Sequence, residues 1–138
     1  MIISVGGGSA IDIAKLINIL AVQDNANVLE YIKNSNLINK KGIPLIAIPT
    51  TIGSGSQSTH FAVAYVDSVK YSVAHDFMMP DFAIIDAELS YSLPKNVTAS
   101  SGMDAFSQAI ESYWSVKSTD ESKKYSSNAI SLIISALP

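Results

Sequence analysis

The sequence predicts an α/β fold, with a parallel sheet in the first two thirds of the chain and helices alone in the last third. Apolar runs alternate with amphipathic helical patterns up to about residue 90, which is typical of strands and helices that alternate around a parallel sheet. From Pro94 onward only helical patterns follow. We therefore place a boundary between an α/β domain, residues 1–93, and the start of a helical domain, residues 94–138.

The first elements are a short strand and an amphipathic helix. Residues 2–5 form an apolar run that ends at three consecutive glycines, which indicates a buried strand followed by a turn. Residues 9–22 then repeat apolar side chains at the spacing of one helical face. These side chains are Ile13, Leu16, Ile17 and Leu20. A weaker helical segment follows at residues 27–33.

Two further apolar runs, residues 43–48 and 82–85, predict buried strands of the sheet. Both are continuous rather than alternating, which suits a parallel strand that is covered on both faces. Between them, residues 61–66 and 69–73 are rich in valine and tyrosine and flank Asp67-Ser68. This pattern predicts a β-hairpin with a two-residue turn.

The last third of the chain predicts two helical regions. Residues 97–116 have a helical pattern, and we expect two pieces separated near Gly102. Ser118 and Glu121 have the spacing of a capping box, so we expect the next helix to begin there. One face of that helix would be lined by Tyr125, Ala129, Leu132, Ile133 and Ala136.

The bulk composition excludes several classes of protein. Hydrophobic residues make up 48% of the 138 residues and charged residues 15%, which is enough to form the core of one domain. A net charge of −3 argues against a general affinity for nucleic acid or anionic membranes. The lack of cysteine excludes disulfides and thiolate chemistry. With no signal peptide and no membrane span in the pattern, we expect a soluble, cytoplasmic protein.

Both ends of the chain predict an incomplete protein. Only five residues precede the glycines, and Pro138 directly follows an apolar helical segment. Removing neighbouring strands and helices leaves apolar surface and strand edges uncovered. We therefore expect the chain to associate with itself, and the whole protein to be a homo-oligomer.

The first candidate site is the run Gly6-Gly7-Gly8-Ser9 between a strand and a helix. Side-chain-free residues let backbone N–H groups approach a pyrophosphate, whose charge the helix N-terminus favours. An alternative is a tight turn in which Ser9 is the N-cap and Asp12 its capping-box partner, with Lys15 facing solvent. The third glycine of the dinucleotide fingerprint is replaced by Ile11, so the pattern alone does not decide.

The second candidate site is the loop that follows the apolar run at residues 43–48. Residues 49–56 contain four hydroxyl groups and two glycines. Because ligands of open α/β folds bind at the carboxyl ends of the strands, we favour ligand contact by this loop. The loop has no lysine at the position that a P-loop requires, and Gln57 stands where a nucleophile elbow needs glycine.

The third candidate site is a polar stripe along residues 104–115. Asp104 and Gln108 are one helical turn apart, and Glu111 and Ser115 continue the same face. A carboxylate with a second donor one turn later is a start for a metal site, whereas a solvated helix face is the alternative. The two histidines, His60 and His75, are candidates for ligands or proton carriers, and in such loops a structural role is the commoner one.

Taken in order, three motifs resemble the iron-containing alcohol dehydrogenase family. They are Gly6-Gly7-Gly8-Ser9-x-x-Asp12-x-x-Lys15, Pro49-Thr50-Thr51-x-Gly53-Ser54-Gly55-Ser56 and Gly102-Met103-Asp104-Ala105. The segment from Pro80 to Asp86 also looks like the strand that precedes the helical domain of that family. The resemblance implies a dinucleotide-binding α/β domain followed by an all-helical metal-binding domain, with the active site in the cleft between them.

The resemblance also implies roles for particular residues. The cofactor, NAD or NADP, would be bound by Gly7, Gly8 and Ser9 at its pyrophosphate, by Thr50, Thr51 and Ser54 along the nucleotide, and by Lys70 at the ribose. Asp104 matches the first metal-binding position, facing the same crevice as the glycines. Gln108 stands where the family has a histidine ligand. Because a neutral amide binds Fe²⁺ or Zn²⁺ more weakly than imidazole does, the resemblance implies a weakened metal site.

The implied activity is metal-assisted hydride transfer between NAD(P) and a small alcohol or aldehyde. The residues at 104 and 108, with Thr59-His60-Phe61 and Lys70-Tyr71-Ser72, look most like a branch similar to phosphonoacetaldehyde reductases, which points to phosphonate metabolism. No catalytic residue is singled out. The alternatives are an enzyme similar to dehydroquinate synthase or glycerol dehydrogenase, and a non-catalytic or truncated nucleotide-binding fragment.

Overall fold

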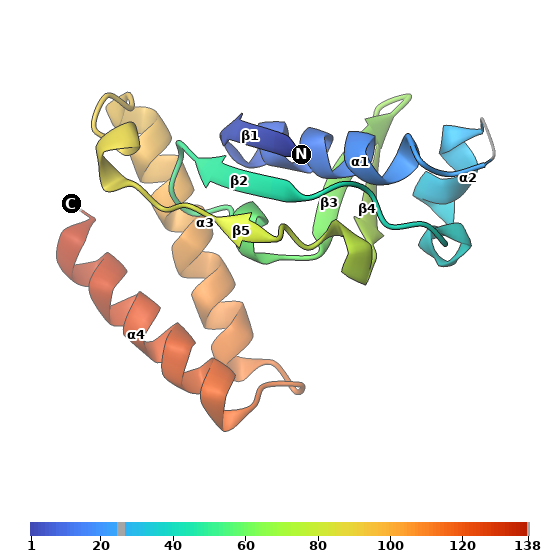
Figure 1. The fold of residues 1–138 in the computed structure, drawn as a ribbon. Coiled ribbons are helices and arrows are strands. Elements are labelled where there is room, and N and C mark those ends of the chain that lie inside the picture. The colour runs from blue at the N-terminus through green and yellow to red at the C-terminus, as the bar shows by residue number, and fades with distance from the viewer. Residues whose placement is uncertain (25–26, 138) are drawn as a thin grey trace. The chain divides into compact units, whose positions relative to one another are not determined.

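The computed structural model describes residues 1–24 and 27–137, which form two compact units (Figure 1). The first unit comprises residues 1–50 and 55–90, and the second comprises residues 51–54 together with the chain from residue 91 onward. Among the helices of the described ranges, none combines the length and the apolar character needed to cross a lipid bilayer.

The first unit contains a three-stranded parallel sheet in the order β1-β2-β5. Strand β1 spans Ile2–Gly6, β2 spans Leu45–Pro49 and β5 spans Phe82–Ala83. Helix α1, Gly8–Leu20, follows β1 and contacts both β1 and β2. The predicted α/β class with a parallel sheet is therefore confirmed. Helix α2, Val28–Lys33, also lies within one residue of its predicted range.

The predicted hairpin is also confirmed. Strands β3, Phe61–Val66, and β4, Val69–Ala74, pair in antiparallel fashion with Val66 opposite Val69. The two turn residues, Asp67 and Ser68, have positive φ angles of 48° and 65°. Two successive residues in the left-handed region match the right-handed twist of the flanking strands, so the turn closes without a glycine.

Helix α1 buries a face that only partly overlaps the predicted one: Leu16 lies in the core and Leu20 packs against it, as predicted. Ile13 and Ile17 are 55% and 59% exposed, whereas Ile11 and Ile19 are almost fully buried. The reason is that the buried face also holds Lys15 and Asn18, which an apolar pattern does not count. The main apolar cluster lies between α1, α2 and the hairpin. It comprises Leu16, Ile19, Tyr31, Ile38, Ala62, Val73 and Met78.

The expected strand at residues 82–85 is shorter and more exposed than predicted. Strand β5 covers only Phe82–Ala83, and Phe82 and Ile85 are 63% and 67% exposed. Among the described residues it pairs only with β2, so it is an edge strand of the sheet. The prediction of a strand that is buried on both faces is wrong for this chain.

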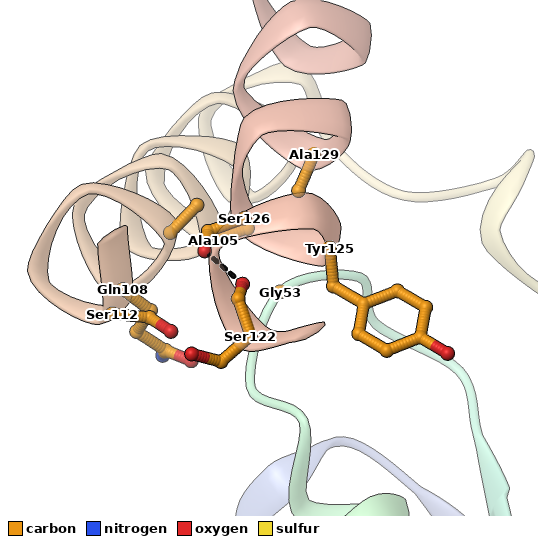
Figure 2. Close-up of a pocket in the computed structure, with 9 residues that line it drawn as sticks. Gly53, Ala105, Gln108, Ser112, Ser122, Tyr125, Ser126 and Ala129 are labelled. Atoms are coloured by element: carbon orange, nitrogen blue, oxygen red, sulfur yellow. Dashed lines mark hydrogen bonds between the residues drawn. The ribbon is translucent and has the colours of Figure 1, made fainter. Parts of the chain in front are cut away.

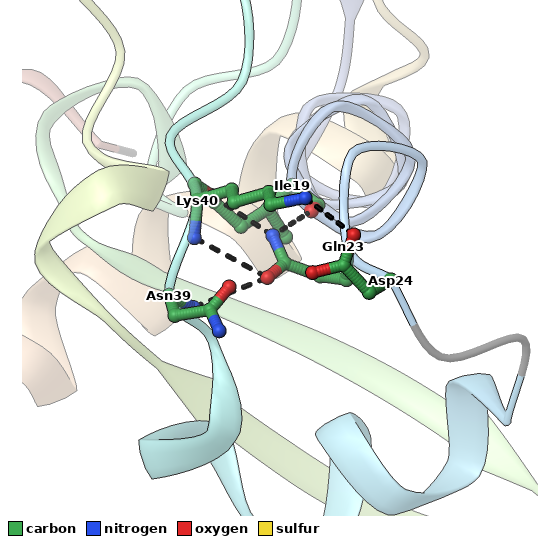
Figure 3. Close-up of polar contacts among 5 residues, drawn as sticks. All are labelled: Ile19, Gln23, Asp24, Asn39 and Lys40. Atoms are coloured by element: carbon green, nitrogen blue, oxygen red, sulfur yellow. Dashed lines mark hydrogen bonds and ion pairs between the residues drawn. The ribbon is translucent and has the colours of Figure 1, made fainter.

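The end of α1 is tied to the segment that leads into β2 (Figure 3). The side-chain amide of Gln23 donates to the carbonyl oxygens of Ile19 at 2.7 Å and of Lys40 at 2.8 Å. Its oxygen accepts from the backbone N–H groups of Asn39 and Lys40, and Lys40 forms an ion pair with Asp24. One glutamine therefore fixes the start of the connection to β2.

The second unit is a pair of helices with the loop at residues 51–54. Helix α3 spans Lys95–Trp114 without a break, so the expected interruption near Gly102 is wrong. A Cβ atom on Gly102 would lie 2.7 Å from Leu137 Cδ1, so this glycine permits close packing inside the unit. Helix α4 spans Asp120–Ala136.

The capping box of α4 is shifted by one residue from the predicted one. The Thr119 hydroxyl accepts from the backbone N–H of Ser122 at 3.1 Å, and the Ser122 hydroxyl accepts from that of Thr119 at 2.9 Å. A serine can take the position of the expected glutamate because its hydroxyl also accepts a hydrogen bond. Short 3₁₀ turns complete the described elements: Ser35–Leu37, Ser56–Ser58, Asp76–Met78 and Ala87–Ser90.

Candidate nucleotide site at the edge of the parallel sheet

The glycine turn connects β1 tightly to α1. Gly6 has a φ of +155°, and a Cβ atom on it would lie 2.7 Å from the Ala10 Cβ. The carbonyl of Gly7 accepts from the N–H groups of Ala10 and Ile11 at 3.0 and 3.2 Å. The first N–H groups of a helix have no partner within the helix, so those at this turn can bind an anion.

The capping interpretation of this turn is wrong. The N-cap of α1 is Gly7, which makes no side-chain capping bond, and Ser9 lies inside the helix with an exposed side chain. Asp12 instead accepts from the backbone N–H of Val63 at 3.0 Å and from the Ser56 hydroxyl. Asp12 lies too far from the N-terminus of α1 to cap the helix, and its carboxylate binds β3 instead.

Lys15 does not face solvent either, since only 1% of it is exposed. Its ammonium group donates to the carbonyl oxygens of Thr59 at 2.7 Å and Phe61 at 2.8 Å. Burial lowers the pKa of Lys15 from its ordinary value of 10.5 to about 8, although the negative charge of Asp12 opposes this shift. The i, i+3 spacing of Asp12 and Lys15 places both on the side of α1 that faces the hairpin.

The second motif begins beside the first. The backbone N–H of Thr50 donates to the carbonyl of Gly6 at 2.9 Å, and Gly6 is opposite Pro49 in the parallel register. The glycine turn and the start of the hydroxyl-rich loop therefore lie together at the carboxyl edge of the sheet. Thr51 and Ser54 belong to the second unit, where their roles stay a prediction.

The remaining residues of the first unit lie on the hairpin. Lys70 is exposed on β4, opposite Tyr65. His60 stacks on Phe61 with ring centroids 4.4 Å apart. His75 Nδ1 accepts from the backbone N–H of Phe77 at 3.1 Å and so caps a 3₁₀ turn, which gives this histidine a structural contact.

The two predicted metal-binding residues lie on α3 in the second unit. Asp104 and Gln108 are both exposed, and the Gln108 amide donates to Asp104 Oδ2 at 2.9 Å. Within residues 1–24 and 27–137, no group of three histidine, cysteine or acidic side chains is placed to hold a metal ion. A single carboxylate bound to a neutral amide does not fit a complete iron or zinc site.

Gln108 also lines a pocket that the sequence analysis missed (Figure 2). The pocket has a volume of about 380 Å³ and lies within the second unit. Its polar lining includes the hydroxyl groups of Ser112, Ser122 and Ser126, and the last of these donates to the Ser122 carbonyl. The available signal was the small residues Ala105, Ala109 and Ala129 on the two helices, which leave space between them.

The geometry of the first unit defines a class of protein. A strand–glycine–helix turn and the start of a hydroxyl-rich loop, at Thr50, meet at the carboxyl edge of a parallel sheet, which is the ligand-binding edge of open α/β folds. The arrangement is that of α/β proteins with a nucleotide-binding sheet. More particularly, the sequence model of the iron-containing alcohol dehydrogenase family matches residues 1–87, and the chain belongs to that family.

Individual relatives agree with the family. Long-chain-alcohol dehydrogenase 1 of Geobacillus thermodenitrificans is 42% identical over 99% of the chain. The structure of sulfoacetaldehyde reductase from Bifidobacterium kashiwanohense in complex with NAD⁺ matches 95% of the chain at 35% identity, with a TM-score of 0.89. An iron-containing alcohol dehydrogenase from Thermotoga maritima matches 99% at 33% identity, with a TM-score of 0.90.

The match covers only part of each relative. The chain spans 35% of the length of the Geobacillus enzyme, 35% of the Bifidobacterium chain and 37% of the Thermotoga chain. The helical part from residue 88 onward lies outside the family-model match but inside the matches to the relatives.

Proposed function

We propose that the whole protein is an NAD(P)-dependent alcohol dehydrogenase or aldehyde reductase that transfers a hydride between the cofactor and a small alcohol or aldehyde. One observation carries the proposal: the Thr50 N–H donates to the Gly6 carbonyl at 2.9 Å, so the glycine turn and the start of the hydroxyl-rich loop lie at one edge of the sheet. Family membership supports the choice of a nicotinamide cofactor, because the Bifidobacterium relative was solved with NAD⁺.

In this proposal the glycine turn, the hydroxyl-rich loop and the hairpin bind and orient the cofactor. The N–H groups of Gly7, Gly8 and Ser9 would bind the pyrophosphate at the start of α1, where the helix dipole favours negative charge. Thr50, Thr51 and Ser54 would donate to the nucleotide, and Lys70 would reach the ribose region. Hydride transfer is the chemistry of the cofactor, and the protein supplies the positions of the reacting groups.

The metal part of the proposal needs ligands from outside this chain. Asp104 would be one ligand of Fe²⁺ or Zn²⁺, and Gln108 would be a weaker second one. Since these two residues do not complete a site, the roles proposed for this chain are to bind and orient the cofactor. The pair is also the observation that favours the second candidate function, a nucleotide-binding protein without catalytic activity.

We also propose the substrate, the cellular compartment and the oligomeric state of the enzyme. Residues 104 and 108, with the segments at 59–61 and 70–72, support a substrate similar to phosphonoacetaldehyde and a role in phosphonate metabolism. The cysteine-free composition suits the cytoplasm. The exposed apolar side chains of the sheet and α1 support a homo-oligomer.

The test is an assay of the whole protein with NADH and with NADPH. The aldehyde panel contains phosphonoacetaldehyde, sulfoacetaldehyde and short and long aliphatic aldehydes, each without metal and with added Fe²⁺ or Zn²⁺. We expect oxidation of the cofactor with at least one aldehyde. Binding of NADH without turnover on any aldehyde would favour the non-catalytic function, and absence of both binding and turnover would overturn the nucleotide site itself.

A further inference from the structure

We propose that Asp12 and Lys15 are positioning residues that hold the segment Ser56–Phe61 in the shape required to bind the cofactor. The inference rests on the proposed function, because it concerns the same sheet edge. Both residues lie on α1, the helix whose first turn would bind the pyrophosphate. One helix would therefore bind the phosphates at its start and fix the neighbouring loop from its side.

Lys15 acts on the far end of the loop. Its ammonium group donates to the Thr59 carbonyl at 2.7 Å and to the Phe61 carbonyl at 2.8 Å, and it lies 3.4 Å from Thr59 Oγ1. These acceptors lie on either side of His60, where the chain leaves the loop and enters β3. A single cation with several donors can hold two carbonyl groups that point the same way, whereas an apolar side chain cannot.

Asp12 contacts the start of the same segment and the strand just beyond its end. Its carboxylate accepts from the Ser56 hydroxyl, in the 3₁₀ turn at Ser56–Ser58, and from the Val63 N–H at 3.0 Å. Ser56 itself is 5% exposed. Asp12 and Lys15 together thus make contacts at residues 56, 59, 61 and 63, of which only 61 and 63 belong to a strand, β3.

The burial of Lys15 argues that these contacts have a use beyond stability. A buried charge carries a desolvation penalty that an apolar side chain at this position would avoid. The main apolar cluster lies next to Lys15 on α1, through Leu16 and Ile19, and a methionine at position 15 would extend it. What the ammonium group supplies here, and an apolar side chain cannot, is donors for the carbonyl oxygens of Thr59 and Phe61.

The experiment compares variants of the whole protein with a matched control. Lys15→Met and Asp12→Asn remove the two sets of loop contacts. The control is Asn18→Leu, because Asn18 is also a buried polar residue of α1 but binds the backbone of Ile43, at 2.8 and 3.0 Å, instead of the loop. Circular dichroism and thermal unfolding establish which variants are folded at the assay temperature.

We expect Lys15→Met and Asp12→Asn each to raise the KM for the nicotinamide cofactor by at least about tenfold, with a smaller change in the KM for the aldehyde. Asn18→Leu should lower the unfolding temperature and leave the cofactor KM unchanged.

The positioning role is wrong if folded Lys15→Met and Asp12→Asn retain the wild-type cofactor KM. It is also wrong if both fail to fold while Asn18→Leu folds, since the pair is then purely structural. A wild-type protein that does not bind NAD(P)H overturns the proposed function instead.

Discussion

At the scale of single residues, Lys15 makes the free energy of unfolding vary with pH in the alkaline range. The pKa of Lys15 is about 8 in the folded chain, because burial disfavours the charged form. In the unfolded chain it has its ordinary value of 10.5. Between these two values the unfolded chain binds more protons than the folded chain, so the contribution of Lys15 to the free energy of unfolding rises with pH. Below pH 8 its burial lowers that free energy by a constant amount.

The comparison of wild type with Lys15→Met isolates this effect from other groups that titrate at high pH. We expect the difference in the free energy of unfolding, wild type minus variant, to increase from pH 8 to pH 10.5 in urea titrations. Parallel pH profiles for the two proteins would show that Lys15 keeps an ordinary pKa in the fold.

Gln108 is the residue proposed as the second and weaker metal ligand, beside Asp104. In the whole protein, Gln108→His places an imidazole one helical turn after Asp104, and imidazole binds iron and zinc more strongly than an amide does. We expect more metal per protein after dialysis against Fe²⁺ or Zn²⁺, measured by elemental analysis. Adding Asp104→Asn to this variant should remove the gain, and an unchanged metal content in Gln108→His would contradict Asp104 as a ligand.

At the scale of elements, the start of α4 offers a direct test of capping. Thr119→Ala removes the hydroxyl that accepts from the Ser122 N–H, so we expect the free energy of unfolding to fall by about 1 kcal/mol. Ser118→Ala is the matched control, because Ser118 lies one residue outside the box. Chemical denaturation should therefore give a lower midpoint for Thr119→Ala than for Ser118→Ala. An equal loss of unfolding free energy in the two variants would contradict the observed capping box.

The elements that could be predicted from sequence are those whose pattern is local. The hairpin at Asp67-Ser68 and the strand–glycine–helix order depend on neighbouring residues, and both agree with the structure. The errors depend on distant partners. Gly102 predicts a break in the helix, but its role is to let Leu137 pack closely against it. Residues 82–85 predict a buried strand, but β5 lies at the edge of the sheet.

The same distinction applies to the site. The motifs identified the glycine turn and the loop, because strand order alone brings carboxyl ends to one edge. The roles of Asp12 and Lys15 could not be predicted, since most of their partners are backbone groups 44 to 51 residues away, and the Ser56 hydroxyl that donates to Asp12 is also 44 residues away. Backbone partners leave no residue type in the sequence to recognise.

At the scale of the whole molecule, exposed apolar side chains predict association of the 138-residue chain. Ile13, Ile17 and Val28 are 45–59% exposed around a groove on α1 and α2, and Phe82 is 63% exposed on β5. Contiguous apolar surface of this kind favours self-association. Light scattering coupled to size exclusion should give a mass above 14.7 kDa, and a stable monomer at micromolar concentration would contradict the expectation.

Gly53 allows the loop at residues 51–54 to pack closely against α3 in the second unit. Its φ is +109°, and a Cβ atom would lie 2.1 Å from the Ser101 carbonyl oxygen, so Gly53→Ala adds both strain and a backbone clash. We expect the free energy of unfolding to fall by about 1–3 kcal/mol or more. Gly55→Ala is the control, because its φ is +65° but no atom lies within 4 Å of the added Cβ. Thermal unfolding should show the larger loss for Gly53→Ala.

The four residues Thr51–Ser54 pack with the helices although they are inserted between two parts of the first unit. The polypeptide therefore passes from one unit to the other three times, after residues 50, 54 and 90. A protease that nicks the chain between Ser90 and Tyr91 would sever one passage and leave two intact. Neither half can be transplanted into another enzyme by a single splice, and a chimaera has to exchange the short insert together with the helices.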